Sequence, residues 1–123
     1  MAEDNTLLYS IIAVLTLMLI VWLHVKPDKI VVIYRFHRPT CRYCVQSQPA
    51  WEAFKATMKS ADPENTIKIK DVNLDYGRES AKLAEKYNVK SVPTVLKVTS
   101  DRVEKYDGPR TVEGFYSFAT TRR

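Results

Sequence analysis

Residues 29–44 read KIVVIYRFHRPTCRYC, an apolar segment that leads into the chain's two cysteines, Cys41 and Cys44. The apolar part, residues 30–36, is typical of a central strand that is covered on both faces. The residues from the first cysteine to Met58 are expected to form a helix. A helix N-terminus favours a thiolate, and the pKa of a cysteine there falls from about 8.5 toward about 3.5–7.5. This context predicts a dithiol that closes and opens a disulfide reversibly.

The N-terminal segment of the chain is apolar. Residues 7–25 contain no Asp, Glu, Lys or Arg, and as a helix they would span about 28 Å, close to the thickness of a bilayer core. Tyr9 and Trp22 lie near its two ends, where aromatic rings favour the membrane interface. A signal peptide would begin with basic residues, and a core helix would have a polar face. Neither pattern is present, so we predict a polar tail at 1–6, a transmembrane helix at 7–25 and one folded domain at 26–123.

The predicted domain is basic. Residues 26–123 hold all 19 Lys and Arg and 12 of the 14 Asp and Glu, a net charge of +7. These charges are spread along the chain, which favours a solvated basic surface beside a bilayer over nucleic-acid binding. Basic residues follow the apolar segment and none precedes it, so the positive-inside rule favours a domain on the cytosolic side. An organelle, a bacterial membrane and the membrane of a large DNA virus all stay open as locations.

The remainder of the domain alternates between strand and helix patterns. Strands are expected at 67–73, 94–98 and 102–106, the last two as a hairpin, and helices are expected at 78–87 and after the cap residue Thr111. The resulting order, β-α-β-α-β-β-α, describes an α/β domain with parallel pairs and one antiparallel hairpin. The aromatic residues expected in the core are Trp51, Phe54, Phe115, Tyr116 and Phe118.

Several motifs together resemble the thioredoxin superfamily, and single protein disulfide isomerase domains in particular. Residues 36–44 are similar to the strand end and active-site loop of those domains, and Pro49 matches the proline that kinks their active-site helix. Val92-Pro93-Thr94 resembles their cis-proline loop, and residues 106–111 resemble the segment that opens their last helix. The resemblance implies a thioredoxin-like mixed sheet flanked by helices. It also implies a thiol–disulfide oxidoreductase or isomerase, here with an N-terminal membrane anchor.

The resemblance also implies a role for each site residue. Cys41 is the exposed nucleophile that attacks a disulfide, and Cys44 resolves the mixed disulfide. Pro93 shapes the groove in which the substrate docks. Arg110 is expected either to approach Cys44 and lower its pKa or to be a plain surface arginine. Arg42 is expected to support the site by favouring the Cys41 thiolate. The residues expected to bind the substrate are Thr40, Tyr43, Val92 and Thr94.

Three departures from the family pattern bear on the chemistry, and one of them is the Arg42-Tyr43 pair between the cysteines. Thr40 stands where the family usually has a tryptophan before the first cysteine. Arg35 stands where the family has a buried acid that helps to move the proton of the second cysteine, and Asp71 aligns with a family lysine. Because a lone buried arginine is costly, we predict that Arg35 and Asp71 contact each other beneath Cys44, with Asp71 as the proton acceptor.

No cofactor is expected, because the redox-active disulfide Cys41–Cys44 carries the chemistry. The expected partners are protein thiols and disulfides, together with the bilayer. A metal site made of the cysteines, His37 and His24 fits no zinc spacing, although ligation across a dimer stays open. The alternative function is a non-catalytic scaffold or structural membrane protein that binds a protein partner. The direction of the redox reaction and the oligomeric state are not predicted.

Overall fold

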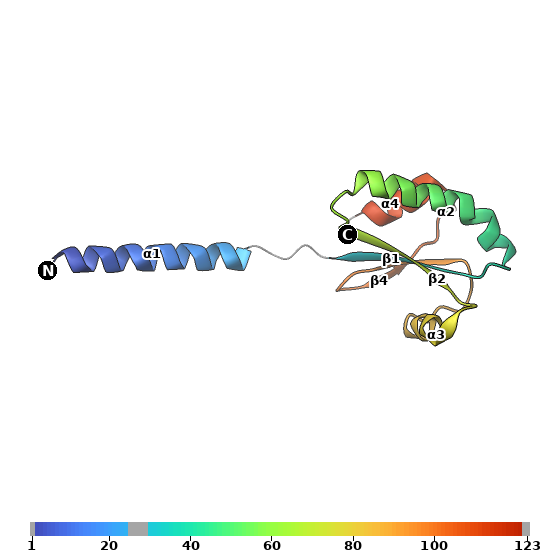
Figure 1. Ribbon diagram of the computed structural model, residues 1–123, viewed down its shortest axis with the longest axis horizontal. Coiled ribbons are helices and arrows are strands. Elements are labelled where there is room, and N and C mark those ends of the chain that lie inside the picture. The colour runs from blue at the N-terminus through green and yellow to red at the C-terminus, as the bar shows by residue number, and fades with distance from the viewer. Residues whose placement is uncertain (1, 25–29, 122–123) are drawn as a thin grey trace.

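The computed structural model describes residues 2–24 and 30–121, and it begins with helix α1 (Ala2–His24) (Figure 1). Within α1, residues Asn5–His24 are long and apolar enough to cross a membrane, and they are not buried against the rest of the chain. Residues 2–6, predicted as a polar tail, belong to this helix, because no proline or glycine interrupts its hydrogen bonding there. Val25, the predicted end of the span, lies outside the described residues.

Residues 30–121 form one mixed sheet with helices on both faces (Figure 1). The strands lie in the order β2-β1-β3-β4; β1 pairs in parallel with β2 and antiparallel with β3, and β3 pairs antiparallel with β4. Helices α2 and α4 cover one face, and α3 covers the other. The bounds are β1 Val31–His37, α2 Arg42–Ala61, β2 Ile67–Asn73, α3 Gly77–Lys86, β3 Thr94–Val98, β4 Val103–Lys105 and α4 Val112–Thr120. The predicted order β-α-β-α-β-β-α is confirmed.

Alternation along β1 sends its side chains into two cores. Ile33 packs with Trp51 and other residues of α2 and α4, whereas Phe36 packs beneath α3. Arg35 has the parity of Ile33, so its side chain enters the layer between the sheet and α2. It is only 1% exposed. The strand period therefore places a cation inside the main core.

The last helix carries one correction to the predicted core. Thr111 caps α4, as predicted, because its Oγ1 accepts a hydrogen bond of 3.1 Å from the main-chain N–H of Gly114. Phe115 is buried and Phe118 is partly buried against the same core. Tyr116, predicted to face inward, is exposed. The inward positions of this short helix repeat every three or four residues, and Tyr116 falls between them.

Candidate functional site

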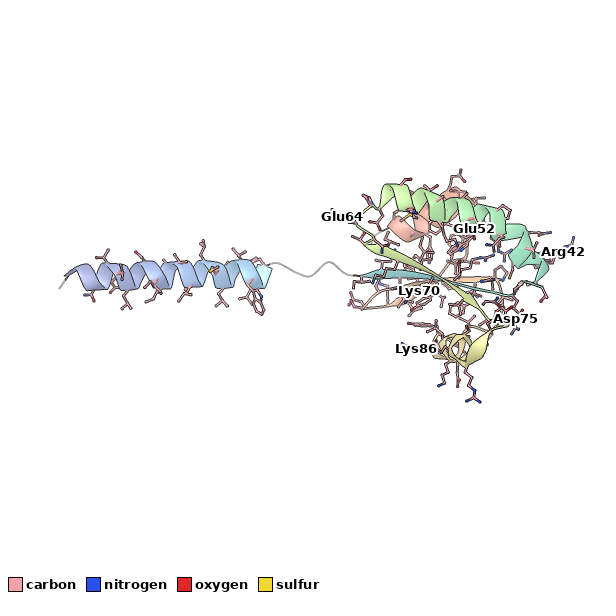
Figure 2. The ribbon with its side chains drawn as sticks, in the orientation of Figure 1. Arg42, Glu52, Glu64, Lys70, Asp75 and Lys86 are labelled. Carbon is pink, nitrogen blue, oxygen red and sulfur yellow. The ribbon has the colours of Figure 1, made fainter. Side chains whose placement is uncertain are left out.

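The two cysteines lie where β1 leads into α2. Figure 2 places Arg42, the residue between Cys41 and Tyr43, at one end of the sheet, while Glu64 lies at the opposite end. Cys41 is the N-cap residue of α2, and its main-chain oxygen accepts the helical hydrogen bond from Val45, 3.0 Å long. The sequence therefore places the first sulfur at the positive end of the helix.

The two thiols have opposite surroundings. Cys41 is partly exposed and Cys44 is buried, and both are free thiols. The pKa of Cys41 is lowered, first by the main-chain N–H of Cys44, then by the Cys44 side chain, the N–H of Tyr43 and the charge of Arg110. Burial raises the pKa of Cys44, and the neighbouring Cys41 raises it further. Cys41 is thus suited to act as the attacking thiolate, and Cys44 to hold its proton until a later step.

The loop before β3 lies against the first sulfur. The thiol of Cys41 donates to the main-chain oxygen of Val92 over 3.8 Å, and the Val92–Pro93 peptide bond is cis. Thr94, predicted to contact the substrate, is 5% exposed, and its hydroxyl donates to the main-chain oxygen of Ser91 over 2.6 Å. The Thr94 side chain is buried at the start of β3 and does not face solvent. It therefore supports the loop through its hydrogen bond to Ser91.

Arg35 lies beneath the N-terminal half of α2 and contacts it through three hydrogen bonds. Its Nη2 donates to the main-chain oxygen of Cys44 at 2.9 Å and to Ser47 Oγ at 3.1 Å, and its Nη1 donates to Gln48 Oε1 at 2.8 Å. The guanidinium also lies over the ring of Trp51, 5.6 Å from its centroid. Burial lowers the pKa of Arg35, but an arginine stays charged in a protein.

Among the described residues, no hydrogen bond or ion pair joins Arg35 to Asp71, although the charge of Asp71 acts on the pKa of Arg35. The two residues are register partners on neighbouring strands. Asp71 instead accepts a 2.6 Å hydrogen bond from Trp51 Nε1 and forms a 2.7 Å ion pair with Lys55. Asp71 lies on the outer strand of the sheet and is exposed. Its carboxylate contacts side chains from the middle of α2. Arg35, with a longer side chain, reaches back to the first turns of the same helix.

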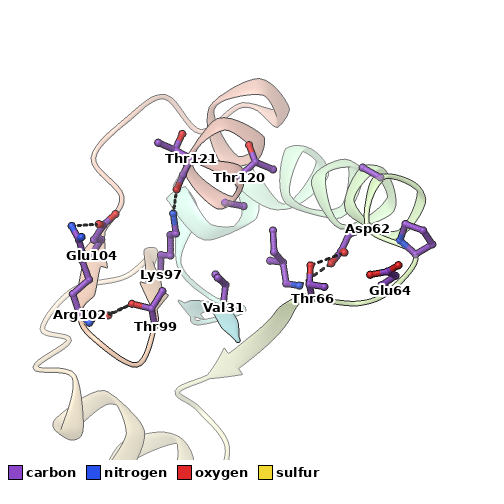
Figure 3. Close-up of a pocket in the computed structure, with 14 residues that line it drawn as sticks. Val31, Asp62, Glu64, Thr66, Lys97, Thr99, Arg102, Glu104, Thr120 and Thr121 are labelled. Atoms are coloured by element: carbon purple, nitrogen blue, oxygen red, sulfur yellow. Dashed lines mark hydrogen bonds and ion pairs between the residues drawn. The ribbon is translucent and has the colours of Figure 1, made fainter. Parts of the chain in front are cut away.

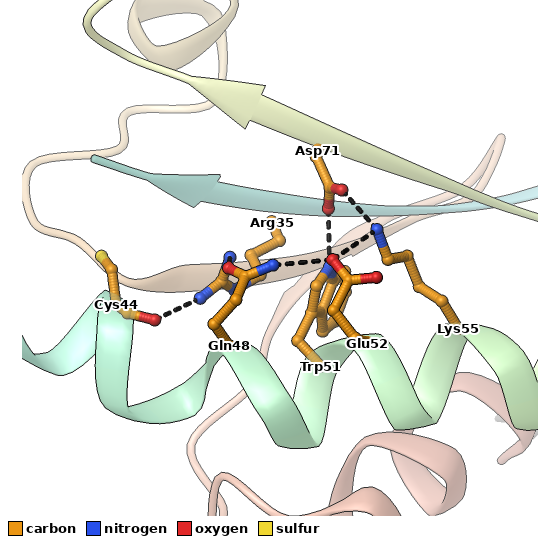
Figure 4. A network of polar contacts seen from close by, with 7 residues as sticks. All are labelled: Arg35, Cys44, Gln48, Trp51, Glu52, Lys55 and Asp71. Atoms are coloured by element: carbon orange, nitrogen blue, oxygen red, sulfur yellow. Dashed lines mark hydrogen bonds and ion pairs between the residues drawn. The ribbon is translucent and has the colours of Figure 1, made fainter. Parts of the chain in front are cut away.

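A chain of polar contacts along α2 connects the two residues indirectly (Figure 4). Gln48, which accepts from Arg35, donates to Glu52 over 2.7 Å. Glu52 lies 3.1 Å from Lys55, which in turn pairs with Asp71. The sequence analysis did not predict Ser47 and Gln48 as site residues. They follow Cys44 by three and four residues and therefore share its helix face.

Arg110 extends from the loop before α4 toward the start of α2. Its guanidinium carbon lies 5.8 Å from the centroid of the Tyr43 ring. The charge of Arg110 contributes to the lowered pKa of Cys41, after the larger effects of the hydrogen bonds from Cys44 and Tyr43. Burial raises the pKa of Cys44, and the main-chain N–H of Arg38 and then the charge of Arg35 act against it. Of the two expectations for Arg110, an effect on Cys44 or a plain surface position, the first is not among the causes that shift the pKa of Cys44. Arg42, expected to favour the Cys41 thiolate, is exposed and is not among the causes that shift the pKa of Cys41.

The loop that carries Arg110 is held by a tyrosine. The hydroxyl of Tyr106 donates to the main-chain oxygen of Pro109. A Cβ on Gly108 would lie 2.7 Å from that hydroxyl oxygen, and a Cβ on Gly114 would lie 2.6 Å from the Pro109 oxygen. Both positions therefore need glycine to let the tyrosine ring and the loop close together.

A shallow groove lies beside the buried cysteine, between the start of α2 and the loop before α4. It measures about 420 Å³ and is lined by Tyr43, Gln46, Ser47, Gly108, Pro109 and Arg110. Of the residues predicted to line the substrate site, Tyr43 faces this groove. Thr40 is exposed on the approach to Cys41.

A larger cavity, of about 590 Å³, is separate from the cysteines (Figure 3). Its lining includes Val31 at the start of β1 and Glu64 in the loop before β2. Inside it, the buried Lys97 donates to the main-chain oxygens of Phe118 and Thr121. Because helix C-termini favour cations, this lysine serves the end of α4 rather than the thiol site.

The described residues contain no group of three or more His, Cys, Asp and Glu arranged to hold a metal ion. His37 ends β1, and burial, followed by the charge of Arg35, lowers its pKa. Its imidazole is therefore neutral at physiological pH, as for a packed histidine at a strand end.

Comparison with known proteins agrees with this geometry. The thioredoxin family model matches residues 23–121. The chain is 35% identical over 86 residues to protein disulfide-isomerase A4 of Bos taurus, covering 70% of this chain and 13% of that protein. It is 31% identical over 89 residues to protein disulfide isomerase-like 1-3 of Oryza sativa subsp. japonica, covering 71% and 16%. The chain thus spans only a small part of the length of these curated relatives.

Solved structures give the same result. The first thioredoxin domain of mouse protein disulfide-isomerase A4 superposes with a TM-score of 0.61 at 28% identity, covering 75% of this chain and 62% of that one. The first two thioredoxin domains of Naumovozyma dairenensis Eps1p match with a TM-score of 0.63 at 26% identity, covering 75% and 34%. The chain therefore belongs to the thioredoxin family, and it carries a Cys-x-x-Cys pair, Cys41 and Cys44, at the start of α2.

Proposed function

We propose that this protein is a membrane-anchored oxidoreductase that exchanges disulfides with protein substrates through Cys41 and Cys44. The observation that carries the proposal is the asymmetry of the pair: Cys41 is accessible at a helix N-terminus with a lowered pKa, and Cys44 is buried with a raised pKa. A nucleophile must be ionised and reachable, and a resolving thiol must wait until the mixed disulfide has formed.

The reaction then has two steps. The Cys41 thiolate attacks one sulfur of a substrate disulfide, forms a mixed disulfide and releases one substrate thiolate. Cys44 next gives up its proton and attacks the Cys41 sulfur, which closes the Cys41–Cys44 disulfide and releases the second substrate thiolate. The substrate disulfide is reduced by two electrons and the protein dithiol is oxidised by two. The reverse sequence oxidises a substrate dithiol, and no cofactor besides the cysteine pair takes part.

The test uses the full chain in detergent micelles with insulin as the disulfide substrate. We expect reduction of insulin in the presence of a thiol donor and loss of this activity in Cys41→Ser. In Cys44→Ser, the mixed disulfide should accumulate and survive acid quenching. If neither variant differs from the unaltered chain, the catalytic proposal fails, and the non-catalytic scaffold becomes the better account.

We further propose that α1 anchors the protein in a bilayer as a single span. What supports this is the apolar, unburied Asn5–His24 segment, a pattern that a signal sequence also has. Extraction of membranes with alkaline carbonate separates the two, because an anchored chain stays in the pellet at full length and a cleaved one does not. The basic residues that follow the span favour a domain on the cytosolic side of the membrane. The resemblance to disulfide isomerases favours the luminal side instead. Labelling of the cysteines in sealed vesicles decides the side.

A further inference from the structure

The groove between the start of α2 and the loop before α4 has a single charged residue in its lining. That residue is Arg110, and the other lining residues are uncharged: Tyr43, Gln46, Ser47, Gly108 and Pro109. Tyr43 is 59% exposed and directly precedes Cys44 in the chain. Any protein segment whose cysteine reacts with Cys41 must lie across the start of α2, and thus near this groove.

Within the described part of the chain, no ion pair joins Arg110 to a carboxylate. Arg38, another arginine close to Cys41 in the sequence, is already paired with Asp75 at 2.9 Å. Arg110 instead lies against the Tyr43 ring, an arrangement that leaves the edge of the guanidinium open to accept a planar anion. Arginine binds carboxylates through two parallel hydrogen bonds, and an aromatic face below it fixes its orientation.

We propose that this groove binds the carboxylate of an Asp or Glu side chain that neighbours the reacting cysteine of the substrate, with Arg110 as its counter-charge. The inference rests on the proposed function and names its substrate class, which is disulfides flanked by acidic residues. The net charge of +7 on residues 26–123 acts in the same direction at longer range, because it attracts acidic segments before contact.

The test compares three disulfide peptides that differ only in the residue next to the cysteine, which is Glu, Gln or Lys. Each peptide reacts with the reduced full chain in detergent micelles, and its rate constant is divided by its rate constant with glutathione. This division removes the effect of the neighbouring charge on the substrate thiol itself. We expect the corrected rate to fall from Glu to Gln to Lys, by about fivefold between Glu and Gln.

The variants test whether the preference for the Glu peptide arises at the groove. In Arg110→Gln the Glu-to-Gln ratio should fall to about one, and in Arg110→Glu the order should reverse in favour of Lys. The matched control, Arg78→Gln, removes the same charge from an exposed position on α3, across the sheet, and should keep the preference. Because the readout is a ratio within each variant, a change in the pKa of Cys41 does not alter it.

The outcomes separate the two proposals. Equal corrected rates for all three peptides in the unaltered chain would overturn the inference and leave the proposed function standing. A preference that survives Arg110→Gln, or that Arg78→Gln removes equally, would also overturn it. The absence of exchange with every peptide would overturn the proposed function and the inference together. If Arg110→Gln fails to fold, the order of the peptides in Arg110→Lys, which keeps the charge, and a fall in the ratio with added salt decide the question.

Discussion

Arg35 donates a 2.9 Å hydrogen bond to the main-chain oxygen of Cys44, so a buried cation lies directly beneath the resolving cysteine. An acid at this position could accept the proton of that cysteine, whereas an arginine can act only through its charge and its hydrogen bonds. The charge lowers the pKa of Cys44 and opposes the larger effect of burial. Arg35 is therefore a positioning residue for the second step of the exchange.

Arg35→Met should slow the resolution of mixed disulfides. Without the cation, only the main-chain N–H of Arg38 still acts against burial, so the pKa of Cys44 rises and less thiolate is present at neutral pH. The measurement is the lifetime of the mixed disulfide by acid quenching, together with the pH dependence of Cys44 alkylation in a Cys41→Ser background. Arg78→Met serves as the control. A lifetime equal to that of the control would mean that Arg35 has only a structural role.

Arg110→Gln should shift the alkylation of Cys41 to higher pH. The thiolate reacts with iodoacetamide, so the rate rises as pH passes the pKa of Cys41. That pKa lies below the ordinary thiol value partly because of Arg110. Removal of the charge moves the midpoint upward and lowers the rate at neutral pH. The amide contributions of Cys44 and Tyr43 remain, so the midpoint should stay below that of a free cysteine. An unchanged midpoint would count against the assigned effect of Arg110.

Trp51→Phe should destabilise the domain by about 1–2 kcal/mol, because it removes the Nε1 hydrogen bond to Asp71 while keeping an aromatic ring in the core. Chemical denaturation of the full chain in micelles measures the change. If the hydrogen bond is responsible, Asp71→Ala should cost less in the Trp51→Phe background than alone. Additive costs of the two substitutions would contradict this explanation.

Gly114→Ala should destabilise the domain although alanine is the better helix former by about 1 kcal/mol. The added Cβ would lie 2.6 Å from the Pro109 oxygen and would also press on the Tyr106 hydroxyl, so the loop that carries Arg110 must move. We expect a loss of about 1–3 kcal/mol in the free energy of unfolding, with a rise in the pKa of Cys41 as Arg110 withdraws. A variant that is more stable than the original chain would show that the loop adapts without cost.

Local patterns in the sequence predicted most of the fold. The period of two in β1 and β2 places Arg35 and Asp71 on the face that α2 covers, and the register pairs them. The helix that begins after Cys41 and the cap at Thr111 also follow from short-range rules. These features depend on residues within a few positions of one another in the chain, so they can be predicted from the sequence alone.

The partners of the long polar side chains were decided by the tertiary structure. Arg35 meets Cys44, Ser47 and Gln48 because the first turns of α2 cross above β1, and Asp71 meets Trp51 and Lys55 further along the same helix. An arginine can reach several acceptors from one backbone position, and packing between distant segments selects among them. The sequence alone determined on which face of the sheet each side chain lies. The path of α2 over that face determined which groups each side chain contacts.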